Sequence, residues 1–164
     1  MSKLKREAHM LYVKAPKMTN YFLVGRDIDD MSVEMNGSFE QKKDITGNTS
    51  VSDTGYQPQV GVEPYYANPD DEIYSFLVDL AMNRKSGDDA KAQFLEVLVE
   101  DATAASHKAW QEDCMIEIVS YGGDTSGMAI PYNIWPNGNR VEGTVTLKNK
   151  IPTFKEATSV SSGT

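Results

Sequence analysis

The sequence contains little cysteine and no long apolar run. Cys114 is the one cysteine among 164 residues, which excludes an internal disulfide framework and a cysteine-rich metal site. No apolar run approaches the roughly 18 residues that a transmembrane helix needs. The first seven residues are too charged for a signal peptide. We therefore expect synthesis in a reducing cytoplasm and no membrane insertion.

Basic residues are also scarce. Lys and Arg number 16 against 24 Asp and Glu, which gives a net charge of −8 at pH 7. Because Lys and Arg supply most of the affinity for nucleic-acid phosphates, this balance argues against a protein that grips DNA. The charge is uneven: residues 1–26 carry +5 and residues 69–101 carry −6. These segments either attract each other between subunits or form solvated surface.

No motif in the sequence nominates a catalytic centre. His9 and His107 have no neighbours that would make a ligand pair or a general base, and Cys114 follows two acidic residues that disfavour a thiolate. The acidic run 70–72 fits the start of a helix better than a metal site. The glycine-rich segment 121–127 lacks the Lys-Ser/Thr ending of a phosphate loop. We predict no enzyme activity, no metal and no cofactor.

Most of the chain has the pattern of antiparallel strands. Short apolar or alternating runs occur at 10–13, 21–24, 31–35, 60–63, 94–100, 115–119, 128–135 and 141–147. Asn137-Gly138 lies between the last two runs, and Asn-Gly is a strong signal for a tight hairpin turn. We therefore predict that 128–135 pairs with 141–147.

One segment has helical periodicity. Ile73, Phe76, Leu77, Leu80 and Ala81 follow the spacing of one helix face. Asn68 is a suitable N-cap, Pro69 suits the first helical turn, and Gly87 is a suitable C-cap. The pattern predicts one amphipathic α-helix at about 69–85 that packs on the sheet.

Two stretches do not fit a compact domain. Residues 36–58 are polar and rich in Gly, Ser and Thr, and they are longer than an ordinary hairpin loop of about 2–5 residues. Such a connection is either disordered or lies against a neighbouring subunit. Residues 156–164 have low complexity and are expected to form a flexible C-terminal tail. Residues 1–155 then form one domain with an N-terminal arm.

The sequence resembles the major tail tube protein of long-tailed bacteriophages and prophages of Gram-positive bacteria. The resemblance covers most of residues 10–155 in the expected order, and it is carried by 24–36, 41–50, 56–67, 117–125, 130–134 and 139–144. It implies a mainly β fold: an antiparallel β-sandwich or partial barrel with one flanking helix, a long projecting loop and terminal arms.

The resemblance also implies a function. Members of this family assemble as rings, usually hexameric, that stack into the hollow virion tail tube through which DNA reaches the host. The implied partners are further copies of the chain, the tape-measure protein, the tail terminator and the distal tail or baseplate proteins. The inter-subunit loop would lie within 36–58, with candidate contact residues Lys42, Lys43, Asp44, Asn48, Asp53 and Tyr56.

In this interpretation the acidic balance acquires a role, because a basic channel wall would bind passing DNA and an acidic one repels it. DNA would be cargo that the protein does not bind. The lumen-facing candidates are glutamates that alternate with apolar positions: Glu34, Glu63, Glu96, Glu100, Glu117 and Glu142. The alternative is that these glutamates lie on the outer surface of the tube.

Two other classes of protein are compatible with the sequence. The first is the inner tube protein of a contractile tail, a tailocin or a type VI secretion device, which works inside a sheath. The second is an isolated ligand-binding β-barrel, which needs a closed pocket with convergent polar groups. Polymerisation favours a tube protein, whereas a persistent monomer favours the isolated barrel.

Overall fold

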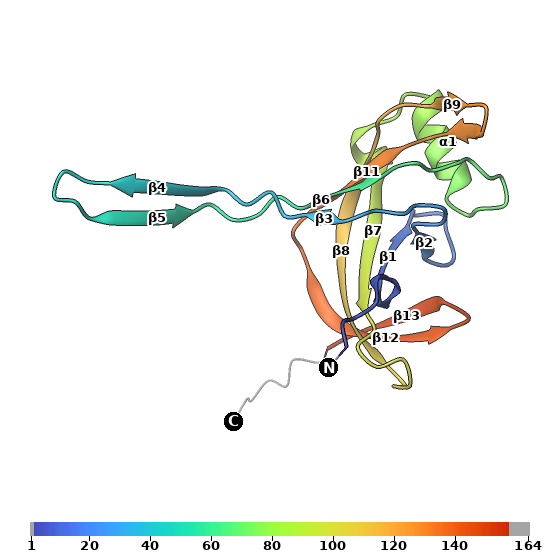
Figure 1. Cartoon of the computed structure of the whole chain (residues 1–164). Coiled ribbons are helices and arrows are strands. Elements are labelled where there is room, and N and C mark those ends of the chain that lie inside the picture. Colours follow the sequence, from blue (N-terminus) through green and yellow to red (C-terminus); the bar gives the residue numbers. More distant parts are fainter. Residues whose placement is uncertain (1, 158–164) are drawn as a thin grey trace.

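The computed structural model describes residues 2–157, which form a curled antiparallel sheet with one helix and a projecting two-stranded arm (Figure 1). The main sheet has the order β2-β1-β7-β8-β11-β6-β3, and β12 pairs with both β8 and β13. Its strands are β1 (His9–Lys14), β2 (Phe22–Val24), β3 (Val33–Glu34), β6 (Gln59–Val62), β7 (Lys91–Leu98), β8 (His107–Ile118), β11 (Tyr132–Pro136), β12 (Val141–Lys148) and β13 (Ile151–Glu156). The expectation of a mainly β, antiparallel fold with one helix is confirmed.

β8 organises the sheet because it is long enough to pair with two strands along one edge. Pro136 of β11 lies opposite Cys114, and Val141 of β12 lies opposite Gln111. β11 and β12 therefore lie end to end along β8, and the predicted hairpin between 128–135 and 141–147 is wrong. The Asn-Gly segment instead lies beside β8 at Asp113, whose backbone N–H donates to the side-chain oxygen of Asn139 at 2.8 Å.

The core is divided between the two faces of the curled sheet. The larger cluster combines Leu77 and Leu80 of the helix with sheet residues such as Phe94, which is fully buried. The smaller cluster lies on the opposite face, where Tyr12, Leu95 and other buried residues pack beneath β12 and β13. Strand alternation sends neighbouring residues to opposite faces, so Phe94 and Leu95 enter different clusters.

The helix α1 (Tyr74–Met82) is shorter at both ends than the predicted 69–85. Asn68 does cap a turn, since its side-chain oxygen accepts from the N–H of Asp70 at 3.0 Å, but the helix begins six residues after Asn68. At the other end, the N–H of Lys85 donates to Leu80 O at 3.2 Å, with Arg84 between them in the left-handed region (φ 54°). Arg84, not Gly87, therefore ends the helix.

Short elements complete the described part of the chain. They are the 3₁₀ turns η1 (Arg6–Ala8) and η2 (Gly87–Ala90) and the hairpin β9 (Gly122–Asp124) with β10 (Gly127–Ala129). The glycine-rich segment is this hairpin: a Cβ on Gly123 would lie 2.3 Å from the carbonyl oxygen of Gly127. No helix within residues 2–157 is long and apolar enough to cross a membrane.

Residues 36–58 project from the body as predicted, but they form an ordered hairpin (Figure 1, left). Its strands are β4 (Phe39–Lys43) and β5 (Thr49–Asp53), which pair over five positions. At the C-terminus, β13 continues to Glu156, one residue into the predicted tail. The rest of that predicted tail, from 158 on, lies outside the described residues.

Candidate assembly interface

The arm, which we define as residues 36–58, is joined to the body by a continuous two-stranded ribbon. β3 and β6 form the base of this ribbon, where Val33 pairs with Val60. Beyond the base, the N–H of Gln57 donates to Met35 O at 3.1 Å, and the side-chain amide of Asn36 donates to Gln57 O at 3.0 Å. The arm is therefore an extension of the main sheet.

A network of hydrogen bonds orders the tip of the arm. The Asp44 carboxylate accepts from the backbone N–H of Thr46 at 2.9 Å and of Asn48 at 3.0 Å, and from the Thr46 hydroxyl at 2.6 Å. These hydrogen bonds hold the pKa of Asp44 below its usual value. Gly47 supplies the left-handed residue (φ 90°) of a three-residue hairpin loop. The tip of the arm thus has a shape that its own hydrogen bonds define.

One face of the arm carries large apolar side chains that nothing within the described chain covers. Phe39 and Val51 share this face because Val51 pairs with Gln41, which lies two residues from Phe39 on β4. The two side chains are 57% and 65% exposed. Tyr56 packs edge-on against Phe39, with 6.0 Å between ring centroids, and is 53% exposed. Ile45 at the tip is fully exposed. Exposed apolar groups rimmed by polar residues are typical of interaction surfaces.

The candidate contact residues all lie on this arm and are exposed. Asp44 and Asn48 form the tip, and Lys43 lies on the same face as Phe39. Lys42 lies on the opposite face, 3.7 Å from the Glu40 carboxylate. Asp53 accepts from the N–H of Gly55 at 2.7 Å, so it stabilises the arm itself. Contacts between these residues and another subunit stay a prediction.

The main sheet also has an exposed face, which we call the polar sheet face. It consists of residues of β3, β6, β7, β8 and β11 whose register partners place them together: Glu34, Gln59, Gly61, Lys91, Gln93, Asp113, Met115, Glu117, Asn133 and Trp135. Three carboxylates and one lysine give this face an acidic balance. The Asn133 side chain donates to Glu117 at 2.8 Å, so the two strands are tied across the face.

The predicted lumen residues do not all lie on this face. Glu34 and Glu117 do, and Glu63 follows directly after β6 and is exposed. Glu142 and Glu96 both lie opposite Trp110, so they share the other face of the sheet. Glu100 lies beyond β7 and pairs with Lys108 at 2.8 Å. The structure thus divides the six glutamates into three settings.

Glu96 belongs to an ion cluster that joins β1, β7 and β8 to the loop before β12. Arg140 contacts Glu96 at 2.5 Å and Glu112 at 2.6 Å, while His9 contacts the other oxygen of Glu96. Burial raises the pKa of Glu96, but hydrogen bonds from His9 and Arg140 more than offset it, so the pKa lies below the usual value. Glu112 is buried and depends on Arg140 for neutralisation. The sequence pattern missed this cluster because its members lie far apart in the chain.

Cys114 and the acidic run 70–72 were the other candidate reactive groups of the sequence. Cys114 is buried, and burial raises its pKa to about 12, so it is a core residue as expected. In the acidic run 70–72, Asp71 accepts from the Tyr65 hydroxyl at 3.0 Å and lies 3.7 Å from Arg26. Among residues 2–157, no three His, Cys, Asp or Glu side chains are placed to hold a metal ion.

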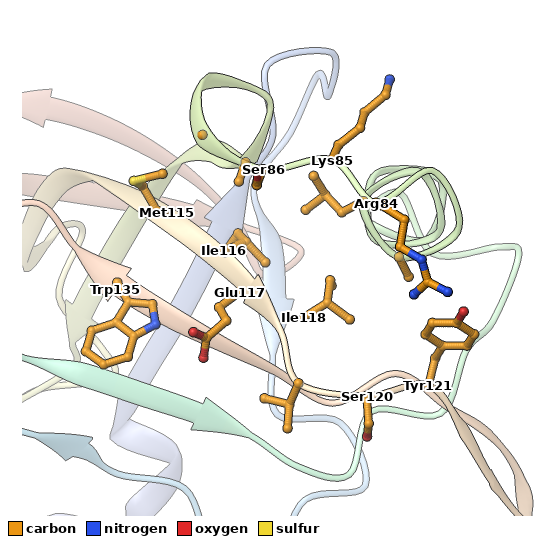
Figure 2. A pocket seen from close by; sticks show the side chains of 15 residues that line it. Arg84, Lys85, Ser86, Met115, Ile116, Glu117, Ile118, Ser120, Tyr121 and Trp135 are labelled. Carbon is orange, nitrogen blue, oxygen red and sulfur yellow. The ribbon is translucent and has the colours of Figure 1, made fainter.

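A groove of about 870 Å³ lies between the C-terminal end of α1 and β8 (Figure 2). Its floor is apolar and includes Ile116 and Ile118. Arg84 extends over the ring of Tyr121, with 5.7 Å from the guanidinium carbon to the ring centroid. With Lys85 and Glu117 also lining it, the groove has a net positive charge.

Comparison with protein families found none that matches this sequence. No curated protein matches it either. Two solved structures are similar in fold. The cap of the anti-feeding prophage, described as a tube-terminating cap, is 13% identical with a TM-score of 0.51, covering 88% of this chain and 93% of that one. The sheath/tube terminator of an extracellular contractile injection system, PVC, is 11% identical with a TM-score of 0.49, covering 87% of this chain and 97% of that one. At these identities, the first match shows a shared fold.

Proposed function

We propose that this protein is a structural, non-catalytic subunit of a tail-like tube, in which copies form rings and the arm of each copy contacts a neighbour. The observation that carries the proposal is the arm, which is ordered yet exposes Phe39, Val51 and Tyr56. An isolated hairpin gains little by displaying such side chains to water, whereas burying them against another copy is favourable. The fold shared with a tube-terminating cap supports the same assignment.

The polar sheet face is the surface that we assign to the channel. It is broad, exposed and acidic, with Glu34, Asp113 and Glu117 against Lys91. Such a wall repels the phosphates of DNA, so a nucleic-acid cargo would pass without binding. A hexameric ring, a virion of a Gram-positive host and contacts with tape-measure, terminator and distal tail proteins belong to this proposal through the sequence resemblance.

A second candidate is a tube terminator, which closes the end of a tube instead of forming its body. The similarity to a tube-terminating cap favours it. The two candidates differ in how rings associate: a body subunit stacks into tubes, whereas a terminator stops at single rings when purified alone.

The test is electron microscopy and sedimentation velocity of the full chain over a range of concentrations. Tubes support the body subunit, single rings support the terminator, and a monomer at millimolar concentration overturns both. The matched variant replaces residues 39–53 by Asn-Gly, which joins Ser38 to Thr54 through a two-residue turn. We expect this variant to keep the circular dichroism spectrum of a folded β protein and to lose assembly.

A further inference from the structure

The arm needs a receptor on the neighbouring copy, and the body offers several grooves. One of about 770 Å³ lies at the root of the arm, where Met35, Tyr56 and Trp135 are among the residues that line it. These three side chains are 49%, 53% and 37% exposed. The groove also contains Glu96, Glu112 and Arg140 of the ion cluster. We call it the root groove.

The charge of the root groove distinguishes it from two other grooves of the body, each of about 870 Å³. Two carboxylates share one guanidinium in its lining, which leaves a net negative charge. The groove beside α1 is net positive, and so is a groove of about 870 Å³ that includes Lys5, Arg6, Arg26 and Lys150. A cationic apolar ligand is therefore favoured in the root groove and disfavoured in these two.

The tip of the arm has the complementary character. Ile45 is fully exposed, and Lys43 is adjacent on the face that carries Phe39 and Val51. Lys42 points to the other face and is close to Glu40. The end of the arm thus presents one aliphatic side chain beside one lysine.

The length of the arm also fits. Met35 and Ile45 are ten residue steps apart in the chain, and ten steps span roughly 34 Å at about 3.4 Å per residue. The body of a chain this size has a radius of gyration near 15 Å and so a diameter of about 35–40 Å. An arm that starts at the root of one copy is therefore long enough for its tip to reach the root groove of the next copy.

We infer that the arm tip of one copy docks in the root groove of a second copy, with Ile45 against Trp135 and Met35 and with Lys43 facing the Glu96–Glu112–Arg140 cluster. This inference rests on the proposed function. Every copy then donates one tip and offers one groove, which is a head-to-tail contact that closes into a ring or continues as a helix.

Disulfide cross-linking tests the contact. Ile45→Cys combined with Asn137→Cys places thiols at the tip and at an exposed position of the root groove, while Cys114 is buried and does not compete. We expect a ladder of cross-linked chains on a non-reducing gel after mild oxidation of assembled protein. The matched control, Ile45→Cys with Lys85→Cys, places the second thiol in the groove beside α1 and should give no ladder.

A charge reversal gives a second readout. Lys43→Glu should raise the concentration needed for assembly by about tenfold, whereas Lys42→Glu, on the opposite face, should change it by less than about twofold, since tenfold corresponds to about 1.4 kcal/mol. Assembly without the Asn137 cross-link, a ladder in the Lys85 control, or equal effects of the two lysines overturns the docking alone. A wild-type chain that never assembles overturns the proposed function and the docking with it.

Discussion

Phe94 in the body and Phe39 in the arm are the same side chain in two strands of one chain, but Phe94 is fully buried and Phe39 is 57% exposed. The body is stabilised by apolar side chains that pack on both faces of the sheet. The arm is stabilised by a backbone ladder, the Asp44 tip and one aromatic pair. The body therefore has the interactions needed to fold alone, and the arm has those needed to hold its own shape. Matched substitutions in the two regions test this difference.

The largest effect is expected from truncating the two phenylalanines. Phe94→Ala leaves a cavity in the main core and should lower the free energy of unfolding by about 3–5 kcal/mol. Phe39→Ala removes an exposed ring and should lower it by less than about 1 kcal/mol, while weakening assembly. Urea unfolding and sedimentation velocity measure the two outcomes. Equal losses of stability would mean that the arm folds as part of the core.

A second pair compares glycines that are crowded for different reasons. A Cβ on Gly143 would lie 2.3 Å from the carbonyl oxygen of Lys155, whereas one on Gly37 would first meet the ring of Phe39 at 2.9 Å. A backbone carbonyl cannot move without breaking the β12–β13 pairing, but an exposed ring can rotate. We expect Gly143→Ala to cost about 1–3 kcal/mol and Gly37→Ala clearly less. Thermal unfolding of both variants measures the difference.

The ion cluster predicts a pH dependence that belongs to the body. Because the folded-state pKa of Glu96 is lowered, its stabilisation is complete above the unfolded-state pKa and is lost as the pH falls through the folded-state value. The free energy of unfolding should therefore fall below about pH 4.5, and less steeply in Glu96→Gln. Glu142→Gln, an exposed change on β12, serves as the control. An identical slope in wild type and Glu96→Gln would contradict this assignment.

The smallest effect is local to the arm. Asp44→Ala removes the acceptor of three hydrogen bonds at the tip. Amide exchange at Thr46 and Asn48 should accelerate while the unfolding of the body stays unchanged. Asp44→Asn retains an acceptor oxygen and should exchange at an intermediate rate. Accelerated exchange throughout the main sheet would show that tip and body are coupled.

The sequence predicted the parts of the fold that depend on local patterns. Leu77 and Leu80 marked the helix face, and the polar segment 36–58 marked the projection. The C-terminal end of the helix was missed because Arg84 adopts the left-handed conformation that usually indicates glycine, and the N-terminal end because Asn68 caps a turn before the helix. The first half of β8 was missed because His107–Asp113 is largely polar. Its strand conformation depends on pairing with β7 and β12, which its composition does not indicate.

The candidate site could be predicted only in outline. The arm was located from composition, but its apolar face emerges only when Phe39 and Val51 are brought together by the register of β4 and β5. Glu96 and Glu117 both alternate with apolar neighbours, so their sequence patterns do not differ. Glu96 nevertheless lies in the ion cluster, whereas Glu117 lies on the polar sheet face. The face of the sheet to which a glutamate points depends on pairing between distant strands, and a single sequence does not contain it.

One edge of β8 pairs with both β11 and β12, and this pairing affects the order in which the chain folds. Antiparallel neighbours β11 and β12 both follow β8, so its edge stays open until synthesis has passed Lys148. β6, from which the arm extends, also pairs with β11. The arm hairpin can close early from local contacts, but it is anchored only when the body is nearly complete. An unfinished chain therefore carries an unanchored arm, so under the proposed function a chain can join a neighbour only once its body is complete.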